Sequence, residues 1–142
     1  MNKVLLVEDD SNYAMAILRV LRATHFQAFL VSTLSQAIEE FKKNGFKAVL
    51  LDVGLPDSDK ERTVKRMKTE YPNCAIVVLS GYEDPDHIKR CIADSASSYL
   101  IKGRDDQNPE MLEAALKEAI SSNSAFHKAV QVKDEIESST QL

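Results

Sequence analysis

Five short apolar runs, separated by segments with helical periodicity, constrain the fold of this chain more than any other feature. The runs are KVLLV, QAFLVS, KAVLLDVGLPD, CAIVVLSGY and SSYLIK, and they begin at residues 3, 27, 47, 74 and 97. The first, third and fourth hold unbroken apolar stretches, which are typical of strands covered on both faces. Strands that alternate with helices form a parallel sheet between two helical layers. The sequence therefore predicts an α/β fold built on a five-stranded parallel sheet.

The segments between the apolar runs carry the stripes and end signals of amphipathic helices. Predicted helices span residues 11–26, 34–43, 58–71 and 85–95, and a fifth begins at Pro109. Either Asp10 or Ser11 can cap the first helix, and Pro72 ends the third. No internal repeat interrupts this alternation.

Composition limits the kind of protein that this chain can be. Its 142 residues are 44% hydrophobic, which suits one domain with one sizeable core, and the apolar runs are too short to span a bilayer. A formal net charge of -4 gives no electrostatic footprint for direct nucleic-acid binding. No signal peptide precedes the first strand, and Cys74 and Cys91 lack CxxC spacing, so we expect reduced thiols and a cytoplasmic protein. We expect His25, His87 and His127 at the surface or at helix ends, because they share no ligand spacing.

Polar side chains collect where four of the predicted strands end. Glu8 and Asp9 follow the first strand, Asp52 ends the third, Ser80 ends the fourth and Lys102 ends the fifth. The carboxyl ends of parallel strands share one edge of the sheet, and ligands bind along that edge. We therefore expect three carboxylates, a hydroxyl and an ammonium group to converge there.

These groups suit the transfer of a phosphoryl group to a carboxylate. A hard divalent cation takes oxygen ligands, which the acids and a backbone carbonyl near Gly54 could provide. The Asp52 carboxylate could act as the nucleophile and form an aspartyl phosphate, while Lys102 and the cation neutralise charge and Ser80 bonds to a phosphate oxygen. Each residue also has an ordinary interpretation: a helix cap, a turn former or a solvated lysine. Coincidence at four strand ends is the weaker explanation, so we favour the site.

The segments VLLVEDD, AVLLDVGLPD, AIVVLSGYED and SSYLIKG resemble, in order and spacing, the receiver domain of two-component response regulators. The resemblance covers Lys3 to about Ser122. It implies a flavodoxin-like fold with strand order 2-1-3-4-5 and helices on both faces. It also implies a signalling function, in which a sensor histidine kinase or a phosphotransfer protein donates a phosphoryl group and the domain changes conformation. Such a domain assists only its own phosphorylation and dephosphorylation, and it is not otherwise an enzyme.

Matched position by position, the resemblance assigns roles to the acids. Asp52 corresponds to the phosphoacceptor and Asp9 to the direct ligand of Mg²⁺. Glu8 corresponds to an acid that acts on the ion largely through water, and Gly54 to the residue that supplies a backbone carbonyl. Asp10 falls on a variable position outside this set.

The resemblance also assigns a switch. Ser80 corresponds to the hydroxyl that follows the phosphoryl group, Lys102 to the lysine that pairs with it, and Tyr99 to the aromatic residue whose rotamer reports phosphorylation. The chain departs from the family in having Gly103 where a proline usually follows the lysine in a cis peptide. A non-proline cis peptide costs about 2.5–4 kcal/mol, so we predict a trans Lys102–Gly103 bond.

Two further glycines of the family are replaced, by Lys60 in the loop after the phosphoacceptor and by Ser95 before the fifth strand. The chemical groups of the site are nevertheless all present.

Two alternative functions remain open at this point. One is a receiver-shaped scaffold that phosphorylation does not control. The other is a small aspartyl-phosphate phosphatase, whose nucleophile lies on the first strand in a DxD pattern, whereas here the acids after the first strand are contiguous and the lone acid is on the third strand.

The predicted receiver domain comprises residues 1–122, and residues 123–142 form a predicted helical extension or linker. An apolar stripe at Phe126, Ala129, Val130 and Ile136 suggests that this extension docks on its own domain or on a second copy, so homodimerisation is left open. No output domain is visible, and we expect neither a membrane nor a nucleic acid as a direct partner.

Overall fold

The computed structural model describes residues 2–123 of the chain. The predicted extension therefore lies outside the described residues from position 124 onward, and its docking stays a prediction. No helix among residues 2–123 is long and apolar enough to cross a membrane.

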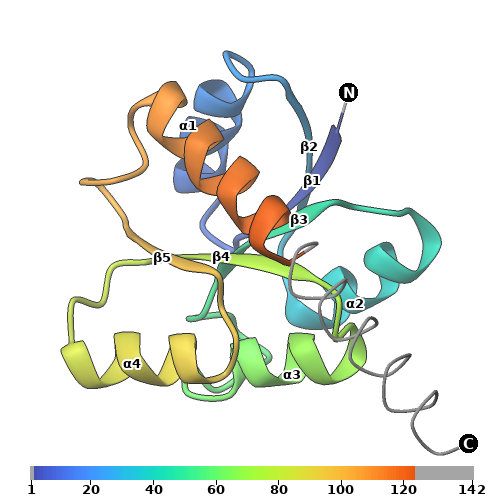
Figure 1. The fold of residues 1–142 in the computed structure, drawn as a ribbon, viewed down its shortest axis with the longest axis vertical. Coiled ribbons are helices and arrows are strands. Elements are labelled where there is room, and N and C mark those ends of the chain that lie inside the picture. The colour runs from blue at the N-terminus through green and yellow to red at the C-terminus, as the bar shows by residue number, and fades with distance from the viewer. Residues whose placement is uncertain (1, 124–142) are drawn as a thin grey trace, which may run out of the picture.

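The core of the fold is a parallel sheet of five strands (Figure 1). They are β1 (Asn2–Val7), β2 (Phe26–Val31), β3 (Ala48–Asp52), β4 (Ala75–Ser80) and β5 (Ser98–Ile101). Their order across the sheet is β2-β1-β3-β4-β5, and every neighbouring pair is parallel. Both the parallel α/β fold and the order implied by the resemblance are confirmed.

Helices cover both faces of this sheet. The named helices are α1 (Ser11–Leu21), α2 (Leu34–Lys43), α3 (Thr63–Glu70) and α4 (Pro85–Ala93), and a fifth occupies residues 109–123. Figure 1 shows α1 and the fifth helix on one side of the sheet, with α2, α3 and α4 on the other.

Alternate residues of the central strands supply the two cores. In β3, Val49 and Leu51 pack with Leu34 of α2, whereas Ala48 and Leu50 belong to the cluster that contains α1 and the fifth helix. All five residues of β3 are buried. This two-sided burial is why the strand reads as an unbroken apolar run, and it prevents the strand from shifting in register without exposing core residues.

The ends of α3 and α4 differ from the prediction by one and two residues, and two other helix boundaries differ by five. The third helix begins at Thr63 rather than at residue 58, because Thr63 Oγ1 donates to Val53 O and the segment before it forms turns. The first helix ends at Leu21 rather than at Phe26, since Phe26 starts β2 and pairs with Asn2. Both differences arise from partners distant in sequence, which helical periodicity does not reveal.

The loop that follows β5 contains no cis peptide bond, and none occurs among residues 2–123. The Lys102–Gly103 bond is therefore trans, as predicted. Gly103 has φ +82°, in the left-handed region that glycine adopts without steric cost.

The junction between α4 and β5 carries a local strain. Ser95 is the one non-glycine residue with positive φ in the described part of the chain, at +79°. An L-residue in this conformation costs roughly 1–2 kcal/mol, whereas glycine has no Cβ to clash.

We predict that Ser95→Gly raises the free energy of unfolding by about 0.5–1 kcal/mol, the relief of strain being partly offset by the greater entropy of an unfolded glycine. Chemical denaturation measures the change. The neighbouring Ser97→Gly is the matched control and should destabilise the protein. A Ser95→Gly protein that is no more stable than the wild type would contradict the prediction.

Candidate functional site

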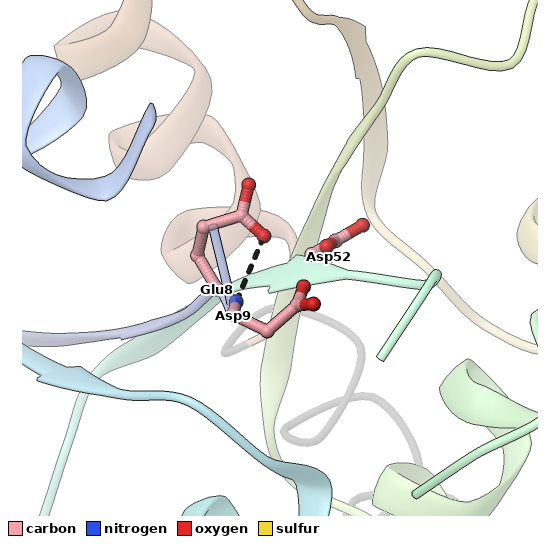
Figure 2. Close-up of side chains that lie close together, drawn as sticks. All are labelled: Glu8, Asp9 and Asp52. Carbon is pink, nitrogen blue, oxygen red and sulfur yellow. Dashed lines mark hydrogen bonds between the residues drawn. The ribbon is translucent and has the colours of Figure 1, made fainter. Parts of the chain in front are cut away.

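The acidic cluster forms because β1 and β3 are hydrogen-bonded neighbours. Val7 pairs with Leu51, so the residues that follow, Glu8 and Asp52, emerge side by side at the carboxyl edge of the sheet. Figure 2 shows their carboxylates with that of Asp9. One carboxylate oxygen from each of the three residues lies within 4.8 Å of the others. The structure therefore brings together the three acids that the sequence placed there.

The fourth acid of this region has a different role. The Asp10 side chain accepts hydrogen bonds from the backbone N–H groups of Asn12 and Tyr13, and so it caps α1. Helix capping thus explains Asp10 but neither of the two acids before it. Of the two candidate caps in the sequence, Asp10 rather than Ser11 is used.

Lys102 supplies the positive charge of the cluster. Its Nζ lies 2.6 Å from Glu8 Oε1 and 3.6 Å from Asp52 Oδ2. Three ionised carboxylates and one ammonium group would leave two net negative charges, which a divalent cation would neutralise. The donor set consists of oxygens, as a hard cation requires, so the residues fit such an ion.

Burial and crowding of the carboxylates favour the protonated form of Glu8. Burial raises the pKa of the Glu8 carboxyl to about 8, and the adjacent Asp52 adds to the increase, while Lys102 opposes it. Glu8 is 2% exposed and Asp52 is 7% exposed, whereas Asp9 is open to solvent. The site therefore has one outward-facing carboxylate and two that solvent barely reaches.

The loop after β3 contacts the Asp52 carboxylate through one backbone hydrogen bond. The backbone N–H of Gly54 donates to Asp52 Oδ1 at 3.0 Å. A Cβ at position 54 would lie 3.7 Å from that oxygen and 3.9 Å from Tyr82 Oη. Tyr82 in turn stacks against the ammonium of Lys60, whose Nζ is 4.1 Å from the ring centroid. The predicted metal contact of the Gly54 carbonyl stays a prediction.

Ser80 and Tyr99 are linked through the backbone of Tyr82. The buried Ser80 Oγ accepts from the N–H of Tyr82 at 3.1 Å, and Tyr99 Oη donates to Tyr82 O at 2.7 Å. The hydroxyl and the aromatic ring that the sequence singled out therefore bond to the same peptide segment between β4 and α4.

His87 lies in the first turn of α4, at a helix end as expected, but it is buried rather than exposed. Its side chain is buried between the rings of Tyr82 and Tyr99, with centroids 5.7 and 5.8 Å away, and Nδ1 is 3.2 Å from Glu61 Oε1. The position faces the sheet because α4 starts at Pro85, which places residue 87 on its inner surface. His25 is exposed as expected, and His127 lies outside the described residues.

Two residues near the site were missed in the sequence. Tyr13 places its ring centroid 4.4 Å from Lys102 Nζ, and its hydroxyl donates to the buried carboxylate of Asp106. In the sequence, Tyr13 lies four residues before Ile17, at the edge of the apolar stripe of the first helix, and so it suggests a packing role. Asp106 lies in a polar loop, where an acid is ordinary. No short-range pattern signals this contact, because the two residues lie 93 positions apart.

Known proteins match most of this chain. The sequence model of a family described as response regulator receiver domain matches residues 4–117. Transcriptional regulatory protein ZraR of Klebsiella oxytoca is 27% identical over 117 residues, which are 82% of this chain and 26% of that protein. A cyclic di-GMP phosphodiesterase of Thermotoga maritima is 27% identical over 124 residues, which are 87% of this chain and 32% of that protein. The chain thus spans less than a third of the length of either relative.

Solved structures agree on the fold. The crystal structure of a response regulator receiver domain protein from Clostridium thermocellum has a TM-score of 0.77 and 21% sequence identity. The likeness covers 89% of this chain and 99% of that one.

The raised pKa of Glu8 predicts a pH-dependent stability in the absence of divalent cations. With a pKa of about 8 for the Glu8 carboxyl, the folded protein would keep this proton up to about pH 8, whereas the unfolded chain would release it near pH 4.5. Folded molecules therefore bind more protons between these limits, and the free energy of unfolding falls as the pH rises through them.

Denaturation of Glu8→Gln at several pH values tests this. The glutamine variant cannot ionise, so we expect its advantage in stability over the wild type to grow between about pH 5 and about pH 8. Glu118→Gln, at an exposed position of the fifth helix, is the control and should follow the wild type at every pH. A constant difference between Glu8→Gln and the wild type would refute the shift.

Proposed function

The chain belongs to the response regulator receiver domain family, and from that premise we propose that Asp52 is the phosphoacceptor of a signalling switch. The observation that carries the proposal is the setting of Asp52, a buried carboxylate at the end of β3 that faces two further acids and an ammonium group. The donor would be a phosphohistidine of a sensor kinase or of a phosphotransfer protein. Neither of the alternative functions is favoured by an observation of its own.

In the proposed step, an oxygen of the Asp52 carboxylate attacks the phosphorus of the phosphohistidine. The new phosphorus–oxygen bond forms as the phosphorus–nitrogen bond breaks, and the imidazole leaves with the electron pair. Lys102 Nζ, 3.6 Å from Asp52 Oδ2, is close enough to turn toward the arriving phosphoryl oxygens. Because Ser80 Oγ already accepts from Tyr82, its own proton can be donated to one of them.

We propose that Asp9 and Asp52 bind Mg²⁺ directly, that Glu8 acts through water, and that Gly54 supplies its carbonyl. The ion, when bound, would neutralise charge on the phosphoryl oxygens. Few protein groups replace the ion's waters, so the binding should be weak.

The conformational signal would pass through Tyr82. The phosphoryl group carries about -1.5 to -2 charge in place of the single charge of the Asp52 carboxylate, and it attracts both Lys102 and the Ser80 hydroxyl. Movement of Ser80 pulls on the Tyr82 N–H, and the same segment holds the hydroxyl of Tyr99 through its carbonyl. The position of Tyr99 is thereby coupled to the state of Asp52.

The domain would act on other molecules through this conformational change and would not turn over an external substrate. We propose no direct contact with nucleic acid. A cytoplasmic location and homodimerisation remain predictions from the sequence.

We predict that Asp52 is the single acceptor of phosphate. Incubation with acetyl phosphate and Mg²⁺ should add the mass of one phosphoryl group to the wild type and nothing to Asp52→Ala, because the nucleophile is gone. Intact-mass spectrometry measures the uptake. Asp86→Ala, which removes an exposed acid from the first turn of α4, is the matched control and should be phosphorylated normally. Magnesium-dependent uptake by Asp52→Ala would defeat the assignment.

A second prediction separates the two neighbouring aspartates. Asp9→Asn should lower Mg²⁺ affinity by at least about tenfold, because it removes a charged ligand, while the loss of like-charge repulsion leaves the fold as stable or more so. Asp10→Asn should leave the affinity unchanged, since asparagine also caps helices well. Calorimetric titration compares the two variants. Equal affinities would remove Asp9 from the proposed ligand set.

A further inference from the structure

Asp106 is a buried acid that the proposed chemistry does not use. It lies in the loop between β5 and the fifth helix and is 1% exposed. Both of its carboxylate oxygens have partners: Oδ1 accepts from the N–H of Gly103 at 3.0 Å, and Oδ2 accepts from the hydroxyl of Tyr13. A buried carboxylate without such partners would be strongly destabilising. Asp106 therefore ties the loop that follows Lys102 to α1.

Tyr13 connects this tie to the acidic cluster. While its hydroxyl is bound to Asp106, its ring lies against Lys102, with the centroid 4.4 Å from Nζ. The ammonium group is thus surrounded by Glu8, Asp52 and an aromatic ring. Burial and the bond to Asp106 raise the pKa of the Tyr13 phenol, so it stays neutral and remains a donor.

Lys102 needs such a constraint because its side chain has four rotatable bonds. Its backbone is fixed by the bond from Lys102 N to Ser80 O, but the ammonium lies closer to Glu8 than to Asp52. To serve Asp52, the ammonium must move from one carboxylate toward the other without escaping into solvent. A ring face attracts a cation without fixing its direction, and so it permits that movement.

We propose that Tyr13 is a positioning residue for phosphoryl transfer, whose ring retains the Lys102 ammonium beside Asp52 and whose bond to Asp106 holds the ring in place. The inference rests on the proposed function of Asp52. The anchor at Asp106 depends on a departure of this chain from its family, which is Gly103 in place of a proline. A proline at position 103 would have no N–H to donate to Asp106.

Three variants separate the contributions of ring and hydroxyl. Tyr13→Leu removes both, Tyr13→Phe keeps the ring, and Asp106→Asn weakens the anchor. Met15→Leu, at an exposed position of α1, is the control and should behave as the wild type.

The first readout does not involve phosphorylation. The methylene protons next to Lys102 Nζ should show an upfield ring-current shift in the NMR spectrum of the metal-free wild type. We expect the shift to vanish in Tyr13→Leu and to shrink in Tyr13→Phe and Asp106→Asn. The amide spectrum reports whether each variant is folded, and if the leucine variant is not, the other two decide the result.

The second readout is the rate of phosphorylation by acetyl phosphate at saturating Mg²⁺. Tyr13→Leu should lower the rate about fivefold, the loss expected for one cation–π contact, and Tyr13→Phe should recover part of it. The half-saturating Mg²⁺ concentration should not change, because Tyr13 is no ligand of the ion, whereas general damage to the site would raise it.

The outcomes distinguish the two proposals. A wild type that takes up no phosphate would overturn the function of Asp52, and the role of Tyr13 with it. A wild type that is phosphorylated normally, together with folded Tyr13 variants that keep both the rate and the Lys102 shift, would overturn the positioning role alone.

Discussion

The site depends on repulsion between the carboxylates of Glu8 and Asp52. The pairing of β1 with β3 imposes this repulsion, because it holds the two side chains next to each other. Val7 and Leu51 are partners in two strands buried on both faces, so neither strand can slide to separate Glu8 from Asp52. Lys102 offsets part of the repulsion, and burial together with the adjacent Asp52 raises the pKa of Glu8. The fold thus stores an unfavourable charge distribution at one edge, and a cation or a change in charge at Asp52 alters it directly.

The sheet and the loops at its edge have different roles in the site. The strands hold the acids, while the responsive groups lie on the segments that follow the strands. Ser80 ends β4 and contacts the peptide of Tyr82, and the same segment bonds to Tyr99 on β5. The buried ring of His87 packs against both tyrosines, so the side chains that would have to rearrange form one contact group. A change in charge at the site would therefore require a few hydrogen bonds to rearrange, while the hydrophobic core stays as it is.

Sequence reasoning recovered what depends on short-range patterns. The apolar runs located every strand, and the acids at their ends located the cluster, because strand ends in a parallel sheet share an edge by construction. The strand order came from the family resemblance, since nothing in an apolar run specifies its neighbour. The start of α3 was missed because the Thr63 hydroxyl bonds to Val53, and Tyr13 and Asp106 were missed because they lie 93 residues apart. The burial of His87 was missed for a related reason, since a polar residue on an inner helix face is satisfied by partners on other elements.

The glycine after Lys102 shows how one departure from a family pattern can recruit other residues. A proline would constrain this loop by its own ring, whereas Gly103 adopts a left-handed conformation that a proline cannot reach. Such freedom has an entropic cost that other contacts must offset. The Asp106 carboxylate provides them, since it receives the N–H that glycine makes available and at the same time the hydroxyl of Tyr13. In this chain the loop is held by hydrogen bonds to Asp106 rather than by a proline ring. Tyr13, which bonds to Asp106, also contacts the ammonium of Lys102. Loop geometry and the placement of the lysine are therefore coupled in this chain through one aromatic residue of α1.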